Sequence, residues 1–122
     1  MDINNPVIKL CLEGTQAEFA KQPERAKALY DQAWSLASDG YEACIAAHYV
    51  ARFQEDAQER LRWNRLALQH AQAVLDGRAD EFYPSLYLNM GSSYEQIGDL
   101  AEAQRYYDLA ATLGVHHQPD KP

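Results

Sequence analysis

The hydrophobic and polar positions of the chain repeat with helical spacing, and a longer period runs over it. The clearest stretch carries Tyr87, Met90, Gly91 and Tyr94, then the pair Gly98-Asp99, then Ala103, Tyr107 and Ala110. Positions three and four residues apart share one face of an α-helix, so each half of this stretch predicts a helix with one apolar face. Gly98-Asp99 predicts the turn between the two helices.

The same spacing occurs twice more in the chain. Gly91, Ala103, Tyr107 and Ala110 are separated by steps of 12, 4 and 3 residues. Those steps recur at the front as Gly14, Ala26, Tyr30 and Ala33, and in the middle as Ala47, Glu59, Trp63 and Leu66. Three matches in one phase predict three helix–turn–helix units, and the aromatic residues at this spacing are expected to be core.

This pattern resembles the tetratricopeptide repeat, which has a small residue and an aromatic on the first helix of each unit, then Ala and an aromatic on the second. The third unit carries nearly the full pattern, while Glu59 stands in the second unit where a small residue is usual. The resemblance implies an all-α solenoid of about six helices. We expect one such domain over residues 1–114 and a loosely ordered tail over residues 115–122, which contains two prolines.

The helix boundaries have local signals of their own. Proline is preorganised for the first turn of a helix, Asp suits its start, and Gly suits its end. The boundary signals are Pro23, Asp39-Gly40, Glu55-Asp56, Pro84-Ser85 and Gly114.

The period between the units is uneven. Gly14 to Ala47 spans 33 residues, but Ala47 to Gly91 spans 44. The surplus falls between Leu66 and Pro84, where Leu68, Ala71 and Leu75 continue the helical spacing. We therefore predict that the fourth helix is about two turns longer than the others and is followed by a loop at 76–80. Such an extension either contacts a partner or is a harmless insertion.

The resemblance also implies where a partner binds. In this family the first helix of each unit lines a concave groove, and the stripe opposite the packing residues faces it. The stripe carries Ile8, Cys11, Thr15, Glu18 and Phe19 on the first helix, Tyr41, Cys44, His48, Ala51 and Arg52 on the third, and Leu88, Ser92, Glu95 and Gln96 on the fifth. The residues expected to contact a partner are Phe19, Tyr41, His48, Arg52, Leu88, Ser92, Glu95 and Gln96.

Two interpretations of Arg52 stay open. Arg52 and His48 are one turn apart and can read a carboxylate or backbone carbonyls of a bound peptide or helix. Alternatively, Arg52 pairs with Glu18 or Glu95 of the same chain.

Charge and composition narrow the function further. With 18 acidic and 11 basic side chains the net charge is −7, which disfavours nucleic acid as a partner. The chain has no apolar run of about 18 residues and no basic, apolar leader at its start, so we expect a cytoplasmic protein that does not enter membranes. Cys11 and Cys44 occupy equivalent places on neighbouring helices, whose axes lie about 8–10 Å apart. A disulfide requires Cα atoms within about 7 Å, so we expect free thiols.

No enzyme signature is present in the chain. Phosphate-binding, dinucleotide-binding, zinc-protease and nucleophile-elbow motifs are all missing. Cys44 and His48 resemble a nucleophile–base pair, but nothing supplies an oxyanion hole or a third orienting group. We therefore expect no catalysis, cofactor or metal.

The sequence therefore predicts a protein-interaction scaffold. The alternative is a self-assembling unit, in which Tyr106, Leu109 and Leu113 leave the last helix uncapped and drive homodimerisation.

Overall fold

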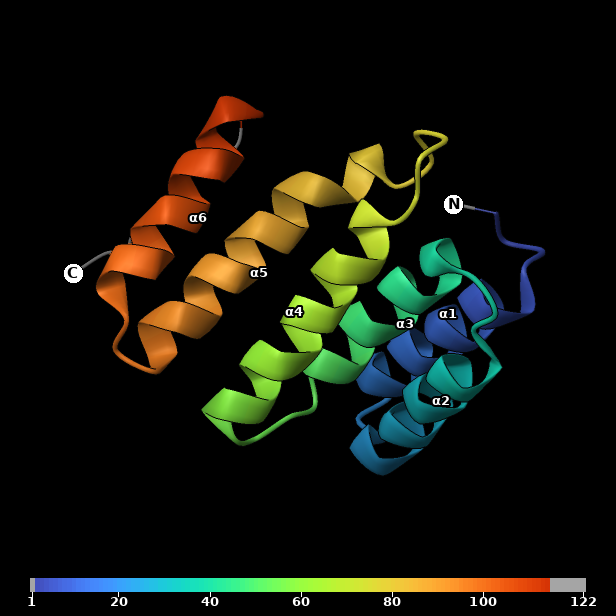
Figure 1. The fold of residues 1–122 in the computed structure, drawn as a ribbon. Helices are drawn as coiled ribbons and strands as arrows, with labels where there is room; N and C mark the ends of the chain where they lie inside the picture. The colour runs from blue at the N-terminus through green and yellow to red at the C-terminus, as the bar shows by residue number, and fades with distance from the viewer. Residues whose placement is uncertain (1, 115–122) are drawn as a thin grey trace.

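The computed structural model describes residues 2–114, and these form α-helices with no strand. The predicted all-α class is confirmed. Each helix packs against its neighbours in sequence, so that α1–α2 lie at one end of the molecule and α5–α6 at the other (Figure 1). The helices are α1 (Pro6–Phe19), α2 (Pro23–Leu36), α3 (Gly40–Ala51), α4 (Ala57–Gln72), α5 (Tyr83–Gln96) and α6 (Leu100–Thr112), with one 3-10 turn, η1 (Asp80–Phe82), before α5. The tail predicted at 115–122 lies outside the described residues.

Side-chain caps fix where the helices begin. The Asp39, Asp56 and Asp99 carboxylates each accept a hydrogen bond from the backbone N–H three residues later, which satisfies a donor that the helix leaves unpaired. Pro23 is the first residue of α2, and Pro84 lies in the first turn of α5. The boundaries predicted from these signals are confirmed.

The two ends of the molecule share one close contact. A Cβ on Gly14 would overlap the ring of Tyr30, and a Cβ on Gly91 would overlap the ring of Tyr107 in the same way. Only glycine lets the paired helix bring its tyrosine this close. The middle unit places Ala47, which is fully buried, at the equivalent position of α3. The contact follows the period seen in the sequence.

The predicted two-turn extension of α4 is wrong. The helix has 16 residues, against 14 in α1, and ends at Gln72. Leu75, which was expected to continue its apolar face, is 93% exposed, so there is nothing there for a longer helix to bury. The surplus residues form a loop and then η1.

The second half of the inserted segment packs back onto the molecule. Ala79 is buried, and the Phe82 ring lies 5.8 Å from the ring of Tyr41 at the start of α3. The Arg78 guanidinium lies 4.8 Å from the centre of the same Tyr41 ring. The insertion therefore folds back onto α3, and Phe82 leads directly into α5.

The last helix presents a mainly polar outer face. Its exposed positions include Gln104, Arg105 and Asp108, and the Gln104 amide donates to the Asp108 carboxylate at 2.9 Å. Tyr106, expected on an open apolar face, is half-buried and stacks on Tyr94 with ring centres 5.7 Å apart. Leu109 is also half-buried, whereas Leu113 is 49% exposed. Of the apolar face expected at this end, α5 covers Tyr106, while Leu113 stays exposed.

No helix within residues 2–114 is long and apolar enough to cross a membrane.

Candidate functional site

The central helix α3 meets α1 on one side through a closed, apolar junction. Ile8 and Cys11 of α1 are 0% and 1% exposed and belong to one core cluster with Ile45 of α3. Both residues were expected on the groove-facing stripe. They lie in the core instead, because α1 packs directly on α3. We call this contact the closed junction.

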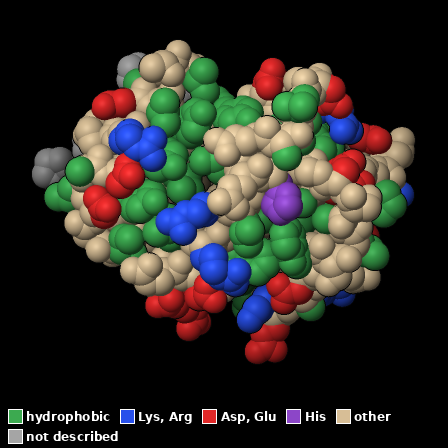
Figure 2. All heavy atoms as spheres, viewed as in Figure 1, with side chains coloured by type: hydrophobic (Ala, Val, Ile, Leu, Met, Phe, Trp, Pro, Cys, Tyr) green, Lys and Arg blue, Asp and Glu red, His purple; other side chains and the backbone are tan. Residues whose placement is uncertain are grey.

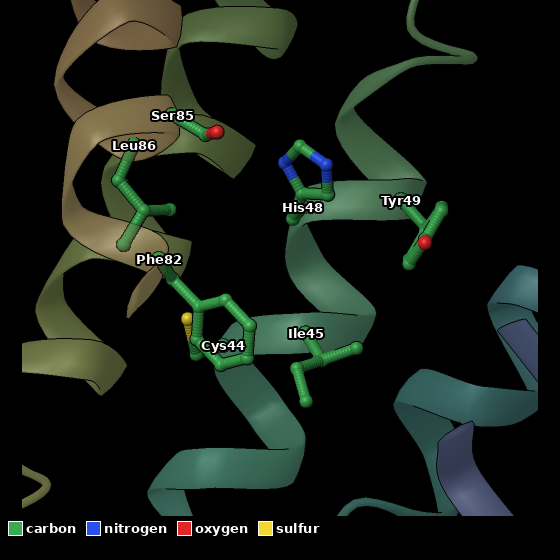
Figure 3. Close-up of a pocket in the computed structure, with 7 residues that line it drawn as sticks. All are labelled: Cys44, Ile45, His48, Tyr49, Phe82, Ser85 and Leu86. Atoms are coloured by element: carbon green, nitrogen blue, oxygen red, sulfur yellow. The ribbon is translucent and has the colours of Figure 1, made fainter. Parts of the chain in front are cut away.

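The other side of α3 faces η1 and α5 and contains a pocket. Its volume is about 180 Å³, and Figure 3 shows Phe82, Ser85 and Leu86 extending toward α3 while Cys44 and His48 extend toward them. The remaining lining residues are Ile45 and Tyr49. We call this space the apolar pocket, since most of its lining side chains are aliphatic, aromatic or thiol.

A second space adjoins the first at His48, which lines both. Its volume is about 290 Å³, and helices α3, α4 and α5 all contribute to it. Its lining residues are His48, Ala51, Arg52, Arg60, Asn64, Asn89, Ser92 and Ser93. We call it the polar hollow, and the two spaces together the open junction. The described residues that line the hollow include no Asp or Glu.

His48 is held as a neutral ring between the two spaces. Its Nδ1 lies 3.1 Å from Nδ2 of Asn89, and the Asn89 amide donates, which places the ring proton on Nε2. Burial lowers the pKa of His48 from its ordinary value, and the positive charge of Arg52 lowers it further. The His48 ring is therefore neutral near pH 7 and lines both spaces of the open junction.

The floor of the polar hollow is fixed by a buried hydrogen bond. The Asn64 amide donates to Oγ of Ser93 at 2.8 Å, and the two residues are 6% and 1% exposed. A buried polar pair that satisfies itself in this way ties α4 to α5 and holds the hollow in one shape.

Two arginines border the hollow in different electrostatic settings. Arg52 donates to Oε2 of Glu18 at 2.9 Å, so the pairing with Glu18 is the interpretation that the structure favours for Arg52. Arg60 donates to the backbone oxygen of Gln54 at 2.6 Å and to the side-chain oxygen of Gln96. Both of these acceptors are neutral.

The predicted partner residues are divided among several places. His48, Arg52 and Ser92 line the polar hollow, and Gln96 lies at its edge through Arg60. Leu88 is half-buried and Glu95 is exposed. Tyr41 is only 8% exposed beneath Phe82 and Arg78, and Phe19 is 84% exposed at the end of α1.

Sequence reasoning missed the contribution of α4, of the insertion and of several residues of α5. Arg60, Asn64 and Asn89 line the hollow, and Phe82 and Leu86 line the pocket. A signal for Asn64 was present, because it interrupts the apolar spacing of its helix between Leu61 and Ala67.

The cysteines are poor nucleophiles in this setting. Cys11 and Cys44 are free and buried, and burial raises the pKa of each thiol to about 12. Each is therefore protonated at neutral pH, although Cys44 shares the apolar pocket with His48. Within residues 2–114 no group of three or more His, Cys, Asp or Glu side chains is arranged to hold a metal ion.

Comparisons with protein-family models, with curated proteins and with solved structures each find no match to this chain.

Proposed function

We propose that this chain is a cytoplasmic protein-interaction module of the tetratricopeptide type, which binds a peptide segment or partner helix along the open junction. The observation that carries the proposal is the pair of adjoining spaces that meet at His48, one apolar and one polar. An extended segment or a helix face that presents an apolar and a polar side chain close together matches this arrangement. The recurring Gly–Tyr contact supports the repeat assignment.

The size of the apolar pocket favours a side chain over a free small molecule. Pockets for drug-sized ligands usually measure about 300–1,000 Å³. The apolar pocket, at about 180 Å³, falls below that range and is of a size for one large apolar side chain. The protonated Cys44 thiol argues against covalent catalysis in the same place. The net charge of −7 argues against nucleic acid, and two free thiols suit a reducing compartment.

A pocket-filling variant tests the proposal. Peptides are selected from a displayed random library on the immobilised wild-type protein and are then measured against Ser85→Trp by fluorescence anisotropy. Ser85 is an exposed residue at the edge of the apolar pocket, so an indole there fills the pocket with little effect on folding. We expect affinity to fall at least about tenfold, the loss of one well-packed apolar side chain.

The matched control is Ser35→Trp, an exposed serine on α2 that lines neither space. It should leave the affinity unchanged, and thermal melts should show both variants folded. Selected peptides that bind Ser85→Trp as tightly as wild type, or a selection that yields no peptide, would contradict the proposal.

A further inference from the structure

Arg60 holds a positive charge at the polar hollow without a carboxylate partner. Within residues 2–114 its guanidinium makes no ion pair and is held by neutral oxygens of Gln54, Glu55 and Gln96. By contrast, Arg62, two residues along the same helix, pairs with Glu59 at 2.6 Å. Arg60 is also half-buried, so its charge has lost part of its hydration. A carboxylate is the group that complements such a guanidinium best.

The other described residues that line the hollow add hydrogen-bond donors and no negatively charged side chain. His48, whose donor is Nε2–H, and Ser92, whose donor is its hydroxyl, line the same space as Arg60. Arg52 borders it as well, and its ion pair with Glu18 is partly exposed, so that pair is weak and leaves other guanidinium N–H groups available. Figure 2 shows basic side chains near the middle of this face, while acidic side chains lie along its lower edge and at its upper and left margins.

We propose that the polar hollow is a carboxylate-binding subsite, in which Arg60 receives an Asp or Glu side chain of the partner. This inference rests on the proposed function and specifies the partner. Because the hollow adjoins the apolar pocket at His48, the acidic side chain is close in the partner's sequence or on its helix face to the apolar side chain that fills the pocket. The partner segment is therefore acidic and apolar, although the module itself carries a net charge of −7.

In this arrangement Arg60 determines which side chain of the partner binds in the hollow. Its position is fixed from two sides, by the loop before α4 and by Gln96 at the end of α5, so little side-chain entropy is lost when a carboxylate binds. A fixed guanidinium in a partly enclosed space discriminates a carboxylate from the isosteric neutral amide. Arg62 lies outside both spaces and has no such role.

A double-mutant cycle tests the inference. Each acidic residue of the selected peptides is changed to its amide, Glu→Gln or Asp→Asn, and affinities are measured against wild type, Arg60→Gln and Arg62→Gln. At one acidic position, the peptide with the amide should bind wild type and Arg62→Gln at least about tenfold more weakly than the peptide with the acid does. Against Arg60→Gln the same exchange should change affinity less than about twofold.

The outcomes separate this inference from the proposed function. Peptides that depend on the apolar pocket but show no acidic position coupled to Arg60 would overturn the carboxylate subsite and leave the proposed function standing. Loss of binding on amidation of the peptide's C-terminus, with no effect of the side-chain exchanges, would also overturn it, because the carboxylate would then be the chain end. If Arg60→Gln unfolds, Arg60→Lys replaces it, because this variant keeps the positive charge. It should retain part of the preference for Glu over Gln in the peptide. A complete loss of that preference would contradict the role of the charge.

Discussion

The two sides of α3 differ although the sequence pattern predicts them alike. Toward α1, the stripe residues Ile8 and Cys11 are completely buried against α3. Toward α5, the same stripe borders two open spaces, because α5 packs chiefly on α4 and α6 rather than on α3. Ile8 and Cys11 of α1 are therefore core, whereas Ser85 and Leu88, at the equivalent positions of α5, are exposed and half-buried.

The insertion between α4 and α5 accounts for the difference. A regular period brings α3 directly against α1, whereas residues 73–82 place Ala79 and Phe82 between α4 and the start of α5. Phe82 packs on Tyr41 and supplies one side of the apolar pocket. Without the insertion, the junction between α3 and α5 would bury the stripe of α3. With it, part of that stripe is left available for a partner.

Truncating one aliphatic stripe residue on α1 and one on α5 should break this comparison most clearly. Ile8→Ala removes a fully buried side chain and should lower the free energy of unfolding by about 2–5 kcal/mol. Leu88→Ala removes a half-buried side chain that belongs to neither core cluster, and it should cost less than about 1 kcal/mol. Urea denaturation of both variants measures the difference, and similar losses would mean that the stripe is buried equally on α1 and on α5.

Removing the aromatic ring of the insertion should have an intermediate effect. Phe82→Ala should lower the free energy of unfolding by about 1–3 kcal/mol, below the cost of a fully buried phenylalanine, because Phe82 is half-buried. The larger pocket should then accept bulkier apolar side chains when peptides are selected again. Phe19→Ala is the control, since this ring is 84% exposed and its loss should change stability by less than about 0.5 kcal/mol. An equal cost for the two rings would show that the insertion does not support the junction.

Much of the fold was predictable because local chemistry decides it. The Gly14–Tyr30 and Gly91–Tyr107 contacts follow from one small residue and one aromatic at a fixed spacing. Helix starts follow from side chains that pair with the first backbone N–H groups, as Asp56 does. These features depend on residues within one helix–turn–helix unit, and such neighbours are visible in the sequence.

The site was harder to predict because it depends on the path of a loop. The spacing of Leu68, Ala71 and Leu75 is helical, yet the helix ends at Gln72, and Gly77 adopts a φ of 87° in the loop that follows. No periodic pattern in the sequence indicates that this loop packs against Tyr41. Arg60 was missed for the same reason, since its neutral acceptors, Gln54 and Gln96, come from a loop and from another helix.

The smallest expected effect concerns the ring of His48, which reports how far solvent enters the open junction. Its pKa lies below the ordinary value of 6.5, so between the two pKa values the unfolded chain binds a proton that the folded protein does not. The free energy of unfolding should therefore fall as the pH is lowered through 6.5, by about 1.4 kcal/mol for each unit by which folding lowers the pKa. His48→Gln cannot take up this proton, so its stability should decrease less between pH 7.5 and pH 5 in urea titrations. If the variant and the wild type lost stability equally over this range, the ring would be hydrated in the folded protein, and the open junction would reach deeper than the walls of the two spaces indicate.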